Sequence, residues 1–180
     1  MSDDWEATRP SSGGEPVIRL GVSACLLGAE VRYDGGHKHN PLLSEAVEWG
    51  VQLVALCPEH GCGLGVPREP MHLEGDPDHP RLRTLYSGRD MTHLVEHWCR
   101  QHIAHGSAGL EGYLLKSRSP SCGLTQVPVG SGDGRPAQPG MGILPRLLRS
   151  ARPNVPIAEG DLLQDGESLW RFLQAAGTRS

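Results

Sequence analysis

Cys25, Cys57 and Cys122 each follow an apolar run with the length of a buried strand, and each stands alone on its own loop. The loop of Cys122 is rich in serine, is stiffened by Pro120 and continues into Gly123. Three thiolates could bind zinc together with a histidine, or hold three irons of a [4Fe–4S] cluster and leave the fourth iron open. The C-x₂-C pairs of structural zinc sites are absent, which favours a cluster or a catalytic site. Taken singly, each cysteine could also be a buried structural residue.

The apolar pattern predicts strands that alternate with helices. This alternation indicates an α/β fold with a mainly parallel sheet, because parallel neighbours need helical crossovers. We predict a single domain with a three-layer, Rossmann-like or flavodoxin-like arrangement. The carboxyl ends of parallel strands meet at one edge of the sheet, so the three cysteines can converge there. The predicted strands are residues 17–24, 51–56, 82–86, 112–116 and 155–157, and the predicted helices are residues 41–49, 90–105, 141–150 and 161–175.

Three segments are predicted to lie outside these elements. Residues 1–16 have the Ser, Gly, Pro and acidic bias of a disordered tail, so the domain is expected to span residues 17–180. Residues 57–80 form a long loop rich in Pro and Gly, which is typical of functional or mobile loops. Residues 130–140 are predicted to be a flexible loop without core-forming residues.

Length and charge limit the classes of function. The chain has 180 residues and a formal net charge of −4, with scattered Lys and Arg. This charge distribution includes no basic patch that would bind duplex nucleic acid or an anionic membrane, so it is more consistent with a small-molecule substrate. No apolar run is long enough to span a bilayer, and the amino-terminal residues lack the pattern of a signal peptide. We therefore predict a cytoplasmic protein, in which metal binding explains the cysteines better than disulfides do.

Four motifs of the sequence are SACLLG at 23–28, VRYDGGH at 31–37, CPE at 57–59 and KSRSPSCG at 116–123. They resemble the DUF523 family, whose characterised members are 2-thiouracil desulfurases, and the resemblance covers nearly the whole chain after the tail. It implies a [4Fe–4S] cluster on Cys25, Cys57 and Cys122, supplied by iron–sulfur assembly machinery, and a thiolated pyrimidine as the substrate. His60 and Cys62 add ligand-capable groups to the loop of the CPE motif.

This resemblance fits a hydrolytic desulfuration without net redox change. An open iron is a soft Lewis acid that would take the substrate sulfur, so that water can attack the carbon and hydrosulfide can leave. A carboxylate beside the cluster could activate the water. Glu59, two residues after Cys57, is the first candidate for this base. Asp34 is the second candidate, although an Asp in a Gly-rich turn is equally expected to form the turn.

The cysteine turn supplies further candidates. Ser117, Ser119 and Ser121 can donate hydrogen bonds to cluster sulfur or to the substrate ring, and local turn capping is their alternative role. Lys116 can pair with a carboxylate or stabilise a developing anion, or it is an ordinary lysine at the end of a strand.

A motif that points to a different enzyme lies in the predicted helix 90–105. His93, Glu96 and His97 match the H-x-x-E-H pattern of inverted zinc peptidases, so a zinc-dependent hydrolase is the rival enzyme. The apolar stripe of this helix comprises Met91, Leu94, Val95, Trp98, His102 and Ile103. Because the two histidines lie off that stripe, a solvated helix face is the better interpretation. Cys99 is expected to be a partly buried core residue. A non-enzymatic iron–sulfur or zinc sensor module is a further alternative.

Overall fold

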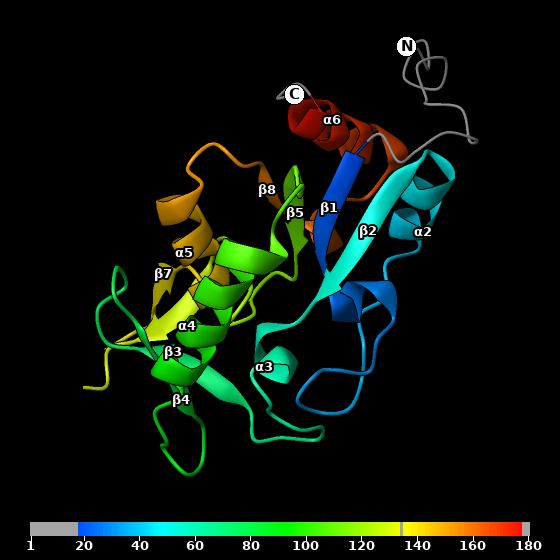
Figure 1. The fold of residues 1–180 in the computed structure, drawn as a ribbon. Coiled ribbons are helices and arrows are strands. Elements are labelled where there is room, and N and C mark those ends of the chain that lie inside the picture. Colours follow the sequence, from blue (N-terminus) through cyan, green and yellow to red (C-terminus); the bar gives the residue numbers. More distant parts are fainter. Residues whose placement is uncertain (1–17, 134, 178–180) are drawn as a thin grey trace.

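The computed structural model describes residues 18–133 and 135–177 and is built around a parallel sheet (Figure 1). The strand order is β2-β1-β5-β8, and all three pairings are parallel. The prediction of an α/β fold with a mainly parallel sheet is therefore confirmed. The tail predicted at residues 1–16 lies outside the described residues. The strands are β1 (Ile18–Ser23), β2 (Val51–Leu56), β5 (Gly112–Leu115) and β8 (Ile157–Glu159).

Helices cover both faces of this sheet, which gives the predicted three layers (Figure 1). Side chains alternate between the faces along each strand. Leu114 therefore joins one buried cluster, and its neighbours Tyr113 and Leu115 join the other. Gly21 makes room for the Tyr113 ring, because a β-carbon there would lie 2.7 Å from it. The helices are α2 (Pro41–Glu48) and α6 (Gly166–Gly177) on the Leu114 face, and α4 (Thr92–Gln101) and α5 (Ile143–Ala151) on the Tyr113 face.

A second sheet was not predicted. Its order is β4-β3-β6-β7, with parallel pairing between β3 and β6 and antiparallel pairing elsewhere. The interpretation of residues 57–80 and 130–140 as loops was therefore wrong in part. Only β4 matches a predicted strand, at residues 82–86. The other three strands have three or four residues, and so short an alternation is lost among Pro and Gly. They are β3 (Met71–Glu74), β4 (Arg81–Thr84), β6 (Val127–Gly130) and β7 (Gln138–Gly140).

The last helix begins later than predicted. A 3-10 turn, η3 (Gly160–Leu162), follows β8, and α6 starts at Gly166 instead of residue 161. The Asp165 carboxylate accepts a hydrogen bond from the Ser168 amide at 2.8 Å, which caps the first turn of α6.

The predicted stripe of α4 needs one correction. Val95 and Cys99 are fully buried, whereas Leu94 is 42% exposed. The buried positions are four residues apart, and Leu94 lies beside this narrower stripe. The helix is continued by one π turn, η2 (His102–Gly106). Among the described residues, no helix has both the length and the apolar character needed to cross a bilayer.

Candidate active site

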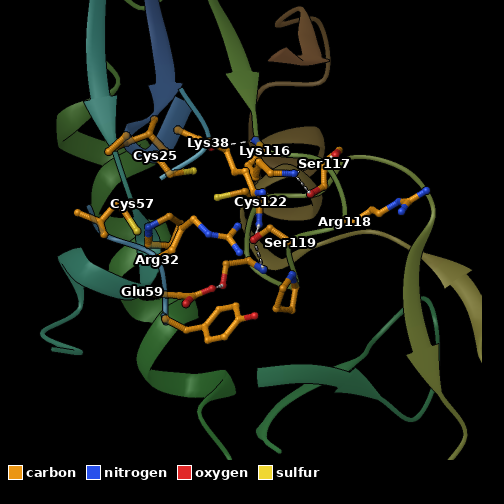
Figure 2. Close-up of a pocket in the computed structure, with 18 of the residues that line it drawn as sticks. Cys25, Arg32, Lys38, Cys57, Glu59, Lys116, Ser117, Arg118, Ser119 and Cys122 are labelled. Carbon is orange, nitrogen blue, oxygen red and sulfur yellow. Dashed lines mark hydrogen bonds between the residues drawn. The ribbon is translucent and has the colours of Figure 1, made fainter. Parts of the chain in front are cut away.

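A cavity of about 350 Å³ lies at the carboxyl edge of the parallel sheet and is lined by all three predicted cysteine ligands. Its walls come from the residues after β1, β2 and β5. Since β1 lies between β2 and β5, this edge is the switch point at which α/β folds bind ligands. Figure 2 shows the sulfur atoms of Cys25, Cys57 and Cys122 facing a common space. The topology thus brings together thiols that are distant in the sequence.

Backbone hydrogen bonds fix the first two thiols. Cys25 lies in the 3-10 turn η1 (Ala24–Leu27), and its carbonyl accepts a hydrogen bond from the Lys38 amide at 2.8 Å. Cys57 is the N-cap of the short helix α3 (Pro58–Gly61), and its carbonyl accepts a hydrogen bond from the Gly61 amide at 2.7 Å. Both cysteines therefore lie in turns that begin as soon as the strand ends.

The serine-rich turn fixes the third thiol. The Ser119 hydroxyl oxygen accepts hydrogen bonds from the Ser121 amide at 3.2 Å and the Cys122 amide at 3.1 Å. This is the local capping role considered for these serines. The first turn of α5 also holds the loop, because the Leu144 amide donates to the Ser121 carbonyl at 2.9 Å. A β-carbon on Gly142 would lie 2.9 to 3.0 Å from this backbone, so the close approach requires glycine.

The three cavity cysteines lie where the ionised thiolate form is unfavourable without a bound cation. Burial, reinforced by the neighbouring Cys57, raises the pKa of Cys25 to about 11, while the Lys116 cation opposes the rise. Burial also raises the pKa of Cys57, and it raises that of Cys122 well above the usual range. A bound cation would reverse this cost, because metal ions favour the deprotonated ligand. Each cysteine ligand of a [4Fe–4S] cluster binds a different iron atom. Three thiols that face one cavity therefore fit such a cluster.

Glu59 lines the same cavity and is held by two partners. Its Oε1 accepts a hydrogen bond from the Ser121 hydroxyl at 2.7 Å. Its Oε2 accepts from the Arg68 Nε at 2.9 Å and from Nη2 at 2.6 Å. Both side chains of this ion pair are largely buried, at 13% and 9% exposed. Sequence reasoning missed Arg68, because nothing in its spacing links it to Glu59.

Lys116 also lines the cavity and is held by Asp161, which the sequence analysis did not identify as a site residue. Its Nζ donates to Asp161 Oδ2 at 2.7 Å and to the Ser117 carbonyl at 2.9 Å. Asp161 lies in η3, directly after β8. The edge rule that placed the cysteines could have found it, since Asp161 is the second residue after the fourth strand of the parallel sheet.

Asp34 does not line the cavity. Its Oδ1 accepts a hydrogen bond from the Gly36 amide at 3.0 Å, and both of its carboxylate oxygens accept from Arg32 at 3.3 Å. These bonds lower the pKa of Asp34, with the Gly36 amide as the largest cause. The geometry is that of a carboxylate that holds a turn.

The H-x-x-E-H segment is not part of the cavity either. His93 and His97 are exposed on α4. The Glu96 carboxylate pairs with Arg146 at 2.6 Å and with Arg100 at 3.6 Å, so its charge is already neutralised. The helix face is therefore a solvated face with ion pairs.

The two remaining cysteines lie outside the cavity lining. The Cys62 thiol donates a hydrogen bond to the Glu59 carbonyl at 3.2 Å. Cys99 is 0% exposed in the core, where burial raises the pKa of its thiol far above the usual range. Cys99 is thus more deeply buried than predicted, and all five cysteines are free thiols.

The fold and the cavity define an α/β protein with a thiol-lined site at its switch point. The chain matches the 2-thiouracil desulfurase family over residues 20–160 and belongs to that family. It is 31% identical to the uncharacterized protein YbbK of Bacillus subtilis (strain 168) over 147 aligned residues. The alignment covers 78% of this chain and 95% of YbbK. It is also similar to the solved structure of the [4Fe-4S]-dependent thiouracil desulfidase TudS. That match has a TM-score of 0.64 and 33% identity and covers 81% of this chain and 93% of TudS. The resemblance to DUF523 is thereby confirmed.

Proposed function

We propose that this chain is a [4Fe–4S]-dependent desulfurase that converts the thiocarbonyl of a thiolated pyrimidine to a carbonyl. The reaction adds one water, replaces C=S by C=O, and releases hydrosulfide and one proton. No electrons are exchanged. The observation that carries the proposal is the convergence of Cys25, Cys57 and Cys122 on one cavity that also contains the Glu59 carboxylate. Membership of the desulfurase family and the cluster dependence of TudS support it.

Cys25, Cys57 and Cys122 are the ligands that would hold the cluster. When bound with one iron open, the cluster supplies a soft Lewis acid for the substrate sulfur. The chain itself binds and orients the pyrimidine ring. Its cavity of about 350 Å³ is within the size range of small-molecule sites, and Tyr33 and Leu56 contribute apolar wall.

Glu59 is the proposed base for the attacking water. A carboxylate has about four acceptor positions. The Ser121 hydroxyl and the two Arg68 nitrogens fill three of them, which leaves one for a water in the cavity. Arg68 and Ser121 thereby orient Glu59. Asp34 is the second candidate, although it would have to leave its turn to act.

The remaining proposed roles belong to Ser119 and Lys116. The Ser119 oxygen already accepts two amides, so its hydroxyl hydrogen is available to a substrate atom. The Lys116 ammonium provides a fixed positive charge in the cavity wall, where negative charge develops on the departing sulfur. Ser121 acts through Glu59, to which it donates its hydroxyl hydrogen.

The site also suggests where the protein works. Five free thiols suit a reducing compartment, so we infer the cytoplasm, where iron–sulfur assembly machinery would supply the cluster.

The proposal is tested by turnover of 2-thiouracil. Protein reconstituted without oxygen is mixed with the substrate, and the formation of uracil and sulfide is measured together. Equal amounts of both are expected from the wild type. The Cys122→Ala variant should form neither, whereas Cys99→Ala should form both. Reconstituted wild type that leaves 2-thiouracil and other thiolated pyrimidines unchanged would contradict the proposal.

A further inference from the structure

Asp161 makes three hydrogen bonds to two neighbouring residues of the active-site wall. Its Oδ2 accepts from the Lys116 ammonium at 2.7 Å and from the Ser117 hydroxyl at 2.6 Å. Its Oδ1 accepts from the Ser117 amide at 2.8 Å. One carboxylate thus holds a charged group, a hydroxyl and a backbone amide.

Lys116 and Ser117 separate two hollows of the molecule. Both residues line the thiol cavity, and both also line a neighbouring pocket that includes Asp161 and Leu162. Asp161 is not among the residues that line the thiol cavity. It therefore holds the cavity wall from behind. Figure 2 shows Lys116 and Ser117 in that wall, near Cys122.

A lysine needs such an anchor to keep one position. Its four-carbon stem has many rotamers, and fixing them costs conformational entropy that a charge-assisted hydrogen bond offsets. The side chains of Lys116 and Asp161 are 16% and 21% exposed, so water screens this pair less than a surface pair. Lys116 has a further bond to the Ser117 hydroxyl oxygen at 3.1 Å, which closes the network.

We propose that Asp161 is a positioning residue of the active site, which acts by holding the Lys116 ammonium and the Ser117 hydroxyl in the wall of the thiol cavity. This inference rests on the proposed function. Each of the first three strands of the parallel sheet then brings a thiol to the site, and the fourth strand brings the carboxylate that orients their cationic neighbour. Preorganised charge stabilises a transition state because it needs no rearrangement during the reaction.

The first test uses turnover kinetics of the reconstituted protein with 2-thiouracil. Asp161→Asn keeps the size of the side chain and removes its charge. We expect kcat to fall about 100-fold with little change in KM, as for a misplaced catalytic group that does not bind the substrate. Asp161→Glu keeps the carboxylate and should recover part of kcat. Asp165→Asn is the matched control, since it removes the charge of an exposed carboxylate that caps α6, a capping role that Asn also fills, and it should keep the wild-type kcat.

The second test uses a double variant and needs no new assay. If Asp161 acts through Lys116, then Asp161→Asn should cost little further kcat in a Lys116→Met background. A residue that only links β5 to η3 would instead lower kcat by the same factor in both backgrounds.

The third test is independent of the cluster and of turnover. The Lys116 amine of the cluster-free protein is acylated under mild conditions and quantified by mass spectrometry. Labelling should be several-fold faster in Asp161→Asn than in the wild type or in Asp165→Asn. Unchanged labelling would show that Asp161 does not hold Lys116. A kcat that is unchanged in Asp161→Asn, or that falls by the same factor in both backgrounds, would show that Asp161 does not act on catalysis through Lys116. A wild type without turnover would instead overturn the proposed function and, with it, the role of Asp161 in catalysis.

Discussion

The three thiols of the cavity differ from the other two in where they lie and what they contact. Cys25, Cys57 and Cys122 line one cavity, whereas Cys62 donates a hydrogen bond to a backbone carbonyl and Cys99 is enclosed in the core. The pKa of each cavity thiol is raised by burial, so these residues gain from a metal partner that favours the thiolate.

Replacement of a single cavity thiol is expected to prevent cluster assembly. Each of Cys25→Ala, Cys57→Ala and Cys122→Ala removes one of the three proposed ligands, and iron and acid-labile sulfide after reconstitution should fall to a small fraction of the wild-type content. Cys62→Ala and Cys99→Ala are the controls and should keep that content. Loss of the cluster in either control would refute the assignment of ligands.

Glu59→Gln is expected to retain the cluster and to lose turnover by about 100-fold or more, the usual contribution of a general base. The amide can still accept from Ser121, but it cannot take a proton. Visible absorption reports the cluster, and uracil formation reports the reaction. Asp34→Asn is the matched control and should turn over normally. If Glu59→Gln stays active and Asp34→Asn does not, the base is Asp34.

The Asp161 carboxylate should make stability depend on pH. Burial alone would raise its pKa, but hydrogen bonds from Lys116 and Ser117 outweigh burial and lower it. Its stabilisation is therefore fully present above the ordinary Asp pKa of about 4 and is lost as pH falls through the lowered value. In urea unfolding of the cluster-free protein, the free energy of unfolding at pH 7 should be about 1–3 kcal/mol higher for the wild type than for Asp161→Asn. The difference should shrink toward pH 3, and a constant difference would contradict this.

The element that carries Cys122 is held by its contact with α5. Amides from the first turn of α5 donate to the carbonyls of Pro120 and Ser121, and Gly142 permits the close approach. The thiol therefore depends on a helix that begins about 20 residues later, and a change in that helix can move it.

Gly142→Ala is expected to disturb the cluster without touching a ligand. The new methyl group would lie 2.9 Å from the Ser121 carbonyl carbon and 3.0 Å from the Cys122 nitrogen, so the loop must shift. We expect a loss of about 1–3 kcal/mol in the free energy of unfolding, as for overpacking, and weaker retention of iron during gel filtration. Gly65→Ala, where a β-carbon meets nothing within 4 Å, is the control. Equal behaviour of the two variants would argue against this role of the α5 contact.

Sequence patterns predicted the elements with long apolar runs, and of the short strands in the second sheet they predicted only β4, at residues 82–86. The strands that precede Cys25, Cys57 and Cys122 were found because buried parallel strands read as continuous apolar runs. The second sheet was missed because β7 has three residues and β3 has four. Arg68 and Asp161 were missed for another reason. Their partners are 9 and 44 to 45 residues away, and no local pattern encodes such pairs.

For the whole molecule, the site joins segments that span most of the fold. Residues from about 23 to 122 line the cavity, and they come from loops after three strands. A cluster bound to these loops would bind the native state and not the unfolded chain, so it should stabilise the entire domain.

Removal of the cluster is therefore expected to lower the melting temperature. A ligand present at 100 times its Kd stabilises by about 2.7 kcal/mol, which corresponds to about 5–10 °C in a chain of this size. The measurement compares reconstituted and chelator-treated protein by thermal unfolding without oxygen. The same treatment should leave the melting temperature of Cys122→Ala unchanged. A shift of equal size in that variant would show that the chelator acts elsewhere.

The iron and acid-labile sulfide content of the purified, anaerobically reconstituted chain, read together with its visible spectrum, is the most direct measurement of the proposed site. We expect about four of each per chain, with broad absorption near the blue end of the visible range that fades on exposure to air. Zinc bound without sulfide would contradict the proposed cluster and the desulfuration that depends on it.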